Sequence, residues 1–491
     1  MTRPTAPIEL TGTASRFGTA VRLPDGFVDD LRSVCEVIDD ERATAEASRD
    51  WWPLALHWSI AGQVPNRAGA VVRPTTTEQV AAVVRRCNES HVPITAAGGR
   101  SGVCGASVPA FGGVVLDTTA LDRIGDVDAA SGVVEVGCGV FGPDLERVLN
   151  THHGLTVGHF PQSFDLATVG GWVACRGAGQ YSTRYGKIED MVVGLEVVLA
   201  DGRVVRTGGA PAAAVGPDLT QVFVGSEGTL GVVTRIWLRT HPVAEVERRA
   251  AYVFPTLTVG FEACRRIVRA GATPAVLRLY DGPESARGHG GDGTECVLLV
   301  LDEGDETIVD AAMSVVDTIA TELGRTGDVG LVAAWTAHRN DTSALQTLTH
   351  KGFVVDTMEI AAPWSRLEAI HAATTAALMA VPHARAATCH LSHSYLDGAC
   401  LYFTFAATPP PDQVDATYVA LWDAGQRAVL GAGGNLSHHH GVGLNRARFV
   451  REALGTAFDV LVGLKTTLDP NGILNPGKLG LPSPFGDPAW P

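Results

Sequence analysis

Residues 93–105 read PITAAGGRSGVCG, a short apolar run followed by Gly98, Gly99, Gly102 and Gly105. The apolar run is typical of a strand. Glycines after it can adopt positive φ and turn their backbone N–H groups toward one point, which is how a backbone nest binds a diphosphate. The spacing is neither GxGxxG nor GxxxxGK[ST], so neither common nucleotide-binding motif explains it.

Two more stretches rich in small residues follow the first. Residues 161–190 read PQSFDLATVGGWVACRGAGQYSTRYGKIED, and residues 225–234 read GSEGTLGVVT. Small side chains allow a flat or charged ligand to approach the backbone closely. Three such stretches are more than turns require, so together they predict a site for one extended, phosphate-bearing ligand.

The surrounding sequence predicts an α+β protein with several domains, as its 491 residues also suggest. AGAVVRP is a strand candidate, and TTTEQVAAVVRRCNESH predicts an amphipathic helix with a threonine cap. After residue 245, longer strands and helices predict an antiparallel sheet covered by helices. We expect an N-terminal extension, a cofactor domain, a substrate (cap) domain, and a C-terminal segment that returns to the cofactor domain, with the boundaries 1–45, 46–245, 246–430 and 431–491.

Composition excludes several classes of function. The net charge is −15, and no basic run is present to neutralise phosphates, so nucleic acid is not an expected partner. No apolar stretch is long enough for a membrane span, and the N-terminus has no signal-peptide core. The nine cysteines form no CxxC pair. We therefore expect reduced thiols and a cytoplasmic location, with peripheral membrane association left open.

In their order and content, the three stretches resemble the FAD domain of the vanillyl-alcohol oxidase / p-cresol methylhydroxylase superfamily. The resemblance implies a two-subdomain FAD-binding fold of that type and non-covalent FAD. The first stretch would wrap the pyrophosphate, the second would pass along the flavin, and the third would lie near the adenosine. The implied FAD contacts are Ala97, Gly98, Gly99, Arg100, Ser101, Gly102, Pro161, Ser163, Thr168, Gly170, Gly171, Ala178, Gly179, Glu227, Gly228, Thr229 and Val233.

Within that superfamily, TVGGWV, YGKIEDMVV, SYLDGACLYFTFA and SHHHGVG resemble the alkyldihydroxyacetonephosphate (alkylglycerone-phosphate) synthases. These enzymes exchange the acyl chain of acyl-dihydroxyacetone phosphate for a fatty alcohol through a flavin adduct, in ether-lipid synthesis and without net redox change. The resemblance implies a lipid-like substrate. We also expect a homodimer, and peripheral membrane contact stays open.

The same resemblance implies roles for six side chains. Tyr395 would be the general acid/base, because neighbouring imidazoles are suited to lowering the pKa of a phenol. Arginines suit a phosphate group because the guanidinium is a planar, permanently charged donor. The implied catalytic residues are Tyr395, His438, His439 and His440, and the implied substrate-binding residues are Arg278 and Arg339. Lys478 is a further candidate to approach the flavin.

The alternative is an FAD-linked D-2-hydroxyacid dehydrogenase or oxidase of the lactate or glycolate type, which has the same fold. Those enzymes often bind a divalent metal, but Ser394, Leu401 and His439 stand where their ligands would be. We therefore expect no metal. His390 and His393 are nearby candidate ligands, but we interpret them as ordinary core or surface imidazoles. If SHHHGVG is strand-like, His438 and His440 lie on one face and His439 on the other.

Overall fold

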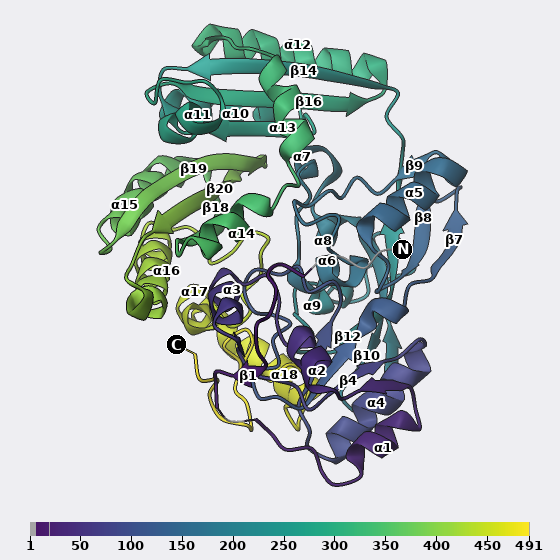
Figure 1. Ribbon diagram of the computed structural model, residues 1–491. Coiled ribbons are helices and arrows are strands. Elements are labelled where there is room, and N and C mark those ends of the chain that lie inside the picture. The colour runs from purple at the N-terminus through teal and green to yellow at the C-terminus, as the bar shows by residue number, and fades with distance from the viewer. Residues whose placement is uncertain (1–5, 19, 491) are drawn as a thin grey trace.

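The computed structural model describes residues 6–18 and 20–490, and its architecture is the expected α+β fold (Figure 1). Among the described residues, a four-stranded sheet, a five-stranded sheet and two short two-stranded sheets lie in the N-terminal half of the chain, and one large antiparallel sheet lies in the second half. The C-terminal segment then packs back against the first half. The candidate site lies where these parts meet.

The first sheet contains the strand that leads into the glycine turn. In spatial order its strands are β2 (Glu36–Ile38), β4 (Ala70–Arg73), β6 (Val114–Asp117) and β5 (Ile94–Ala97). β5 and β4 are both parallel to β6, whereas β2 is antiparallel to β4. The helix α4 (Thr77–Glu89) begins where Thr76 accepts a hydrogen bond from the Gln79 N–H, which satisfies a free donor of the first turn.

The second sheet is antiparallel and carries the third glycine-rich stretch at the start of one strand. In spatial order its strands are β11 (Val204–Arg206), β10 (Val192–Val198), β12 (Val232–Arg239), β8 (Val133–Gly137) and β7 (Ile124–Asp128). Helix α4 contacts β10 and β12, so it joins the two sheets through a shared apolar core. That core holds the backbone turns that follow β5 and precede β12 in fixed positions.

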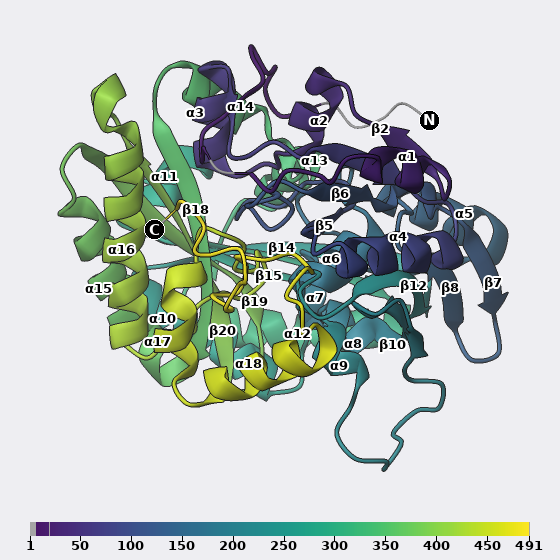
Figure 2. The same ribbon diagram turned by 90° about the horizontal axis from the view of Figure 1, so that it is seen from below.

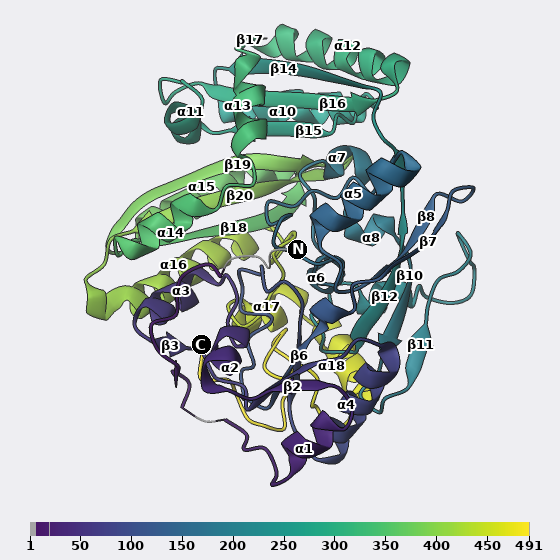
Figure 3. The same ribbon diagram turned by 45° about the vertical axis from the view of Figure 1, so that its right-hand side comes forward.

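The third sheet has seven antiparallel strands. Its spatial order is β17 (Arg325–Thr326), β14 (Val246–Phe254), β16 (Cys296–Gly304), β15 (Val276–Tyr280), β19 (Ala384–Ser394), β20 (Gly398–Ala407) and β18 (Val354–Pro363). One face packs against long helices, as in Figures 1 and 3: α10 (Leu257–Arg269), α12 (Glu306–Leu323), α15 (Leu367–Met379) and α16 (Val414–Gly431).

Two shorter helices lie on the other side of this sheet. Helix α13 (Gly330–His338) contacts β14 and β16, and α14 (Ser343–His350) contacts β18 and the N-terminal helix α3 (Pro53–Ile60). Alternate residues of β14 and β16 point to opposite faces and so pack into separate apolar clusters. The face covered by α13 and α14 is the one that meets the cofactor half of the molecule.

The C-terminal segment runs between the two halves, with helices α17 (Val450–Leu454) and α18 (Ala457–Leu468), as Figure 2 shows from below. Its final part pairs with β5: the Ile94 N–H donates to the Ile473 carbonyl at 2.9 Å, and the Asn475 N–H donates to the Ile94 carbonyl at 2.8 Å. All nine cysteines are free thiols. Among the described residues, no helix combines the length and apolarity that crossing a membrane requires.

Candidate functional site

A cavity of about 700 Å³ lies between the cofactor half and the seven-stranded sheet. All three small-residue stretches line one part of it. The other part is lined by α14 and the facing strands, through Ala344, Leu345, Leu348, Val355, Thr357, Ala386, Thr404 and Ala406. The sequence segments that were expected to form one ligand site therefore lie around one cavity.

The first loop has the close backbone approach that a diphosphate site needs. A Cβ on Gly98 would lie 2.3 Å from the Thr168 Oγ1, and one on Gly99 would lie 2.0 Å from the Leu166 carbonyl oxygen. Arg100 has a left-handed φ of 52°, as expected in a nest of backbone N–H groups. The first and second stretches thus touch, and they leave a backbone-lined cradle into which an FAD pyrophosphate fits.

Most of the expected FAD contacts line this cavity. They comprise all six residues of the first loop, six of the seven in the second stretch, and three of the four in the third. Gly179 and Thr229 are not part of the lining. A Cβ on Gly179 would lie 2.6 Å from the Phe160 backbone nitrogen, and the Thr229 hydroxyl donates to the Ser226 carbonyl at 2.7 Å. Both residues hold the shape of the lining rather than facing the cavity.

A further indication of a bound ligand is His159, which sequence reasoning did not single out. Its ring is fully buried and lines the cavity, and neither ring nitrogen has a hydrogen-bond partner within the chain. Leaving both nitrogens unpaired is costly, so a polar ligand is the expected partner. Burial lowers the pKa of His159 to about 3, which leaves the ring neutral.

The SHHHGVG segment is an irregular loop, so the expectation of a strand with alternating faces is wrong. Glu359 of β18, which is fully buried, organises it. One carboxylate oxygen of Glu359 accepts the N–H groups of His438, His439 and His440 at 3.2, 3.0 and 2.7 Å. Three consecutive N–H groups converge on one oxygen, so the three imidazoles leave the loop as a group instead of alternating.

Glu359 is itself paired with the buried Arg446 in a two-pronged ion pair. Burial alone would raise the pKa of Glu359, but the Arg446 guanidinium outweighs it and holds that pKa well below its usual range. The second half of the loop is held by Glu227, whose carboxylate accepts the N–H groups of Val442 at 2.6 Å and Gly443 at 2.9 Å. Glu227 therefore ties the third stretch to the histidine loop.

The two loop glycines are required by close contacts. Gly441 has a φ of 78°, and a Cβ there would lie 2.4 Å from a carboxylate oxygen of Glu227. Gly443 has a φ of 53°, and a Cβ there would lie 2.1 Å from the Cys104 carbonyl oxygen in the first loop. Both positions need a residue that tolerates positive φ and lacks a side chain.

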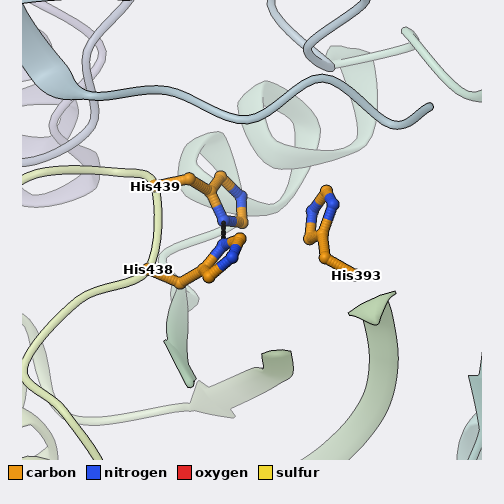
Figure 4. Close-up of side chains that lie close together, drawn as sticks. All are labelled: His393, His438 and His439. Carbon is orange, nitrogen blue, oxygen red and sulfur yellow. Dashed lines mark hydrogen bonds between the residues drawn. The ribbon is translucent and has the colours of Figure 1, made fainter. Parts of the chain in front are cut away.

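Tyr395 and two of the histidines form a continuous hydrogen-bonded chain. The Tyr395 hydroxyl lies 2.5 Å from the His438 Nε2, and the His438 Nδ1 lies 2.8 Å from the His439 Nδ1 (Figure 4). Burial, followed by the nearby charge of Lys187, lowers the pKa of His438 to about 3. Burial raises the pKa of Tyr395, so the expected lowering of its pKa is wrong. All three groups are therefore neutral at neutral pH.

His393 joins this group from β19. Its ring stacks on His438 with centroids 4.9 Å apart, and its Nδ1 lies 2.6 Å from the Ser182 hydroxyl. One ring nitrogen from each of His393, His438 and His439 lies within 4.8 Å of the other two, and the three rings face one another (Figure 4). His393 is buried in the site and lines the cavity together with His439 and His440, whereas His438 and Tyr395 lie behind that lining.

The two arginines both lie close to Trp335. The guanidinium carbon of each is 5.8 Å from the Trp335 ring centroid. Arg278 lines the cavity, whereas Arg339 is packed on aromatic rings, with Tyr181 at 4.7 Å.

Lys478 is not in the lining; it is fully buried and donates to the Val108 carbonyl at 2.7 Å, so the suggestion that it approaches the flavin is not supported.

Both halves of the chain match known protein families. Residues 68–208 match an FAD binding domain, and residues 243–479 match the C-terminal domain of FAD linked oxidases. FAD is therefore the cofactor that the cradle holds. Residues 1–67 precede the first of the two matched ranges.

Three relatives span nearly the whole chain. An uncharacterized FAD-linked oxidoreductase, YgcU of Escherichia coli O157:H7, is 34% identical over 92% of this chain and 98% of its own length. The alkyldihydroxyacetonephosphate synthase of Dictyostelium discoideum is 29% identical over 85% of this chain and 74% of its own. The glycolate oxidase subunit GlcD of Bacillus subtilis is 28% identical over 87% of this chain and 92% of its own.

Solved structures show the same fold. An alkyldihydroxyacetonephosphate synthase structure superposes with a TM-score of 0.76 at 24% identity, covering 96% of this chain and 88% of the other. A p-cresol methylhydroxylase superposes with a TM-score of 0.77 at 19% identity, covering 96% and 99%. Together with the two family matches and the alkyldihydroxyacetonephosphate synthase relative, this shared fold confirms the resemblance to that superfamily.

Proposed function

The chain belongs to the FAD-linked oxidases, and from that membership we propose that it catalyses an exchange of the synthase type, in which an acyl group on a phosphorylated ketone is replaced by a long-chain alcohol. The observation that carries the proposal is the second part of the cavity. Its lining includes aliphatic and small side chains of α14 and the facing strands, together with the polar Arg287, Asp341 and Asp356. A two- or three-carbon hydroxyacid would leave that part unfilled.

Bound FAD supplies an electron-accepting ring beside the substrate carbon. The chain's own residues supply anion binding and proton transfer. Arg278 reaches the cavity and suits a phosphate oxygen. In the proposed exchange, the bond from the substrate carbon to the acyl oxygen breaks and a bond to the alcohol oxygen forms. The alcohol proton leaves with the released fatty acid, so no net oxidation occurs.

The chain of Tyr395, His438 and His439 fits the proton-handling part of this reaction. With all members neutral, it has two self-consistent arrangements. In one, the Tyr395 hydroxyl donates to the His438 Nε2 and the His438 Nδ1–H donates to the His439 Nδ1; in the other, both directions are reversed. Because the neutral His439 carries one proton in both, a switch that brings a proton from His438 to its Nδ1 releases the proton on its Nε2 toward the cavity, and the reverse switch takes one up there, while Tyr395 loses and regains a proton at the other end. His439 lines the cavity and is the member that meets the substrate.

The test is incorporation of a labelled fatty alcohol into acyl-dihydroxyacetone phosphate by the FAD-loaded protein, without an electron acceptor. Release of one fatty acid for each alcohol incorporated is the expected result. No incorporation across a series of acyl and alcohol chain lengths would reject the proposed exchange.

The second candidate is oxidation of a D-2-hydroxyacid, supported by the 28% identity to a glycolate oxidase subunit. Arg278 would then bind the carboxylate, and the neutral His439 would accept the hydroxyl proton. Bleaching of the flavin absorbance by D-lactate or D-glycolate under anaerobic conditions is the outcome that would favour this candidate over the exchange.

A further inference from the structure

The guanidinium of Arg278 is fixed from behind by two polar side chains. Its Nε donates to the Tyr280 hydroxyl at 2.8 Å, and its Nη2 lies 2.6 Å from the His390 Nε2. The other ring nitrogen of His390, Nδ1, lies 3.1 Å from a carboxylate oxygen of Glu284. Arg278 lines the cavity, whereas His390 and Glu284 do not.

The donors and acceptors of this chain allow one arrangement of protons. A guanidinium has only donors, so the His390 Nε2 must be the acceptor and carry no proton. The imidazole proton is then on Nδ1, where it donates to Glu284. Burial lowers the pKa of His390, which is consistent with a neutral ring. The carboxylate therefore sets the tautomer that lets the imidazole accept from the arginine.

We infer that Glu284 and His390 are positioning residues that hold Arg278 in the orientation that binds the anionic group of the substrate. An arginine side chain loses substantial rotamer freedom when it binds an anion from a free state. Here Nε and Nη2 are already engaged, so the guanidinium plane is set before the substrate arrives. The anion then meets a preorganised donor, which favours affinity.

A bulge in β19 places His390 on the same face of the sheet as His393. His390 pairs with Tyr402 and His393 pairs with Cys400, and a register shift lies between Leu391 and His393. Facing residues of an antiparallel pair share a face, so the bulge puts two histidines three residues apart on the same side. His390 also stacks on Tyr402, with centroids 4.8 Å apart and an angle of 14°, and Tyr402 lines the cavity.

The inference rests on the proposed function only for the identity of the anion, so it is tested with a simple probe. Binding of inorganic phosphate to the FAD-loaded protein is measured by calorimetry for the wild type, Arg278→Met, His390→Phe, His390→Gln and Glu284→Leu. His390→Phe keeps the stacking on Tyr402 but removes the acceptor, and we expect its phosphate affinity to fall about tenfold or more. His390→Gln restores an acceptor and should recover part of that loss.

The matched control is Glu295→Gln, which breaks the exposed ion pair with Arg325 in the same domain. It should bind phosphate like the wild type. With a turned-over substrate, the His390 and Glu284 variants should raise KM while kcat changes little, because the reacting groups are untouched. Equal phosphate affinity in the wild type and His390→Phe, while Arg278→Met loses it, would overturn the inference. A wild type without synthase activity would reject the proposed exchange and leave this result unaffected.

Discussion

At the residue scale, the histidine loop depends on a carboxylate that lies far from it in sequence. Glu359 accepts three consecutive N–H groups of the loop on one oxygen and pairs with Arg446 through both oxygens. Neither residue stood out in the sequence, because a lone glutamate in a strand and a lone arginine after a glycine loop carry no pattern. The same holds for Glu284 and His159. Long-range pairing is what identifies them.

Replacing Glu359 by Gln should destabilise the protein strongly. The substitution keeps the size of the side chain but leaves the fully buried Arg446 without its counter-charge. Breaking a buried ion pair by removing one partner typically costs about 3–5 kcal/mol. Urea unfolding followed by circular dichroism measures the loss. Glu322→Gln, which breaks an exposed pair with Arg266, is the control and should unfold like the wild type. Equal midpoints for all three proteins would contradict this role of Glu359.

Replacing Tyr395 by Phe should remove a proton-transfer partner without disturbing the cradle. The hydroxyl contacts the His438 Nε2, and the ring lies behind the cavity lining. General acid/base groups contribute about 10²–10⁴-fold to a rate, so we expect kcat to fall by that factor. FAD content, read from the visible spectrum, should not change. A variant with normal FAD content and full activity would exclude Tyr395 from the reaction.

The histidine cluster should not hold a stoichiometric metal ion. His438 uses both ring nitrogens in hydrogen bonds, and His393 uses Nδ1 with Ser182. Only the Nε2 atoms of His393 and His439 remain, which is fewer than a zinc site needs. Elemental analysis of the purified protein should find less than one equivalent of zinc or manganese, and a chelator should leave the activity unchanged. One bound equivalent that is lost in a His393→Phe variant would show that the hydrogen bonds open to admit a metal.

At the element scale, periodic segments were predictable and irregular ones were not. The helix expected in TTTEQVAAVVRRCNESH is α4, and its threonine cap is formed by Thr76. The histidine loop was expected to be strand-like, with neighbouring side chains on opposite faces. Instead, its N–H groups turn onto Glu359. The bulge in β19 was equally hidden, since residues 388–394 are buried on both faces of the sheet and show no alternation that an extra residue could interrupt. That bulge determines that His390 and His393 lie on the same face of the sheet.

Helix α14 and the facing strands should set the length of chain that the enzyme accepts. Leu348 of α14 and Ala406 of β20 both line the second part of the cavity. Leu348→Trp should fill that part, so kcat/KM should fall more for long alcohols than for short ones. About 1–3 kcal/mol of discrimination is typical of one methylene-sized misfit in an apolar pocket. Thr347→Trp places the same ring on the exposed face of α14 and is the control. An equal loss for every alcohol length would assign this part of the cavity another role.

At the scale of the whole molecule, the site forms only when three distant parts of the chain meet. The cradle comes from the first half, Arg278 and Glu359 from the seven-stranded sheet, and the histidine loop from the C-terminal segment. The motifs made this grouping predictable, because all of them resembled one family. The energetic cost of this grouping was not predictable. Bringing the three parts together buries several neutral imidazoles, and their burial depends on packing between the two halves.

This burial should make the stability of the protein fall as the pH is lowered. Burial lowers the pKa values of His159 and His438 to about 3 in the folded state, against about 6.5 in an unfolded chain. Between these values the unfolded state binds more protons. The stability each group contributes is therefore complete above pH 6.5 and is lost as the pH falls toward 3, at about 1.4 kcal/mol per pH unit per group.

The His159→Phe variant tests this dependence, since its ring can still pack against Trp172, which lies 4.7 Å from the His159 ring. With saturating FAD, urea unfolding at pH 6.0, 5.5 and 5.0 should give a slope of unfolding free energy against pH that is shallower than the wild type by about 1.4 kcal/mol per unit. His153→Gln, at the exposed end of helix α5 (Gly142–His153), provides the comparison for loss of a histidine outside the core. If His159→Phe and the wild type have the same slope, the His159 imidazole takes up a proton inside the folded protein. It would then have to be a cation in the flavin cavity.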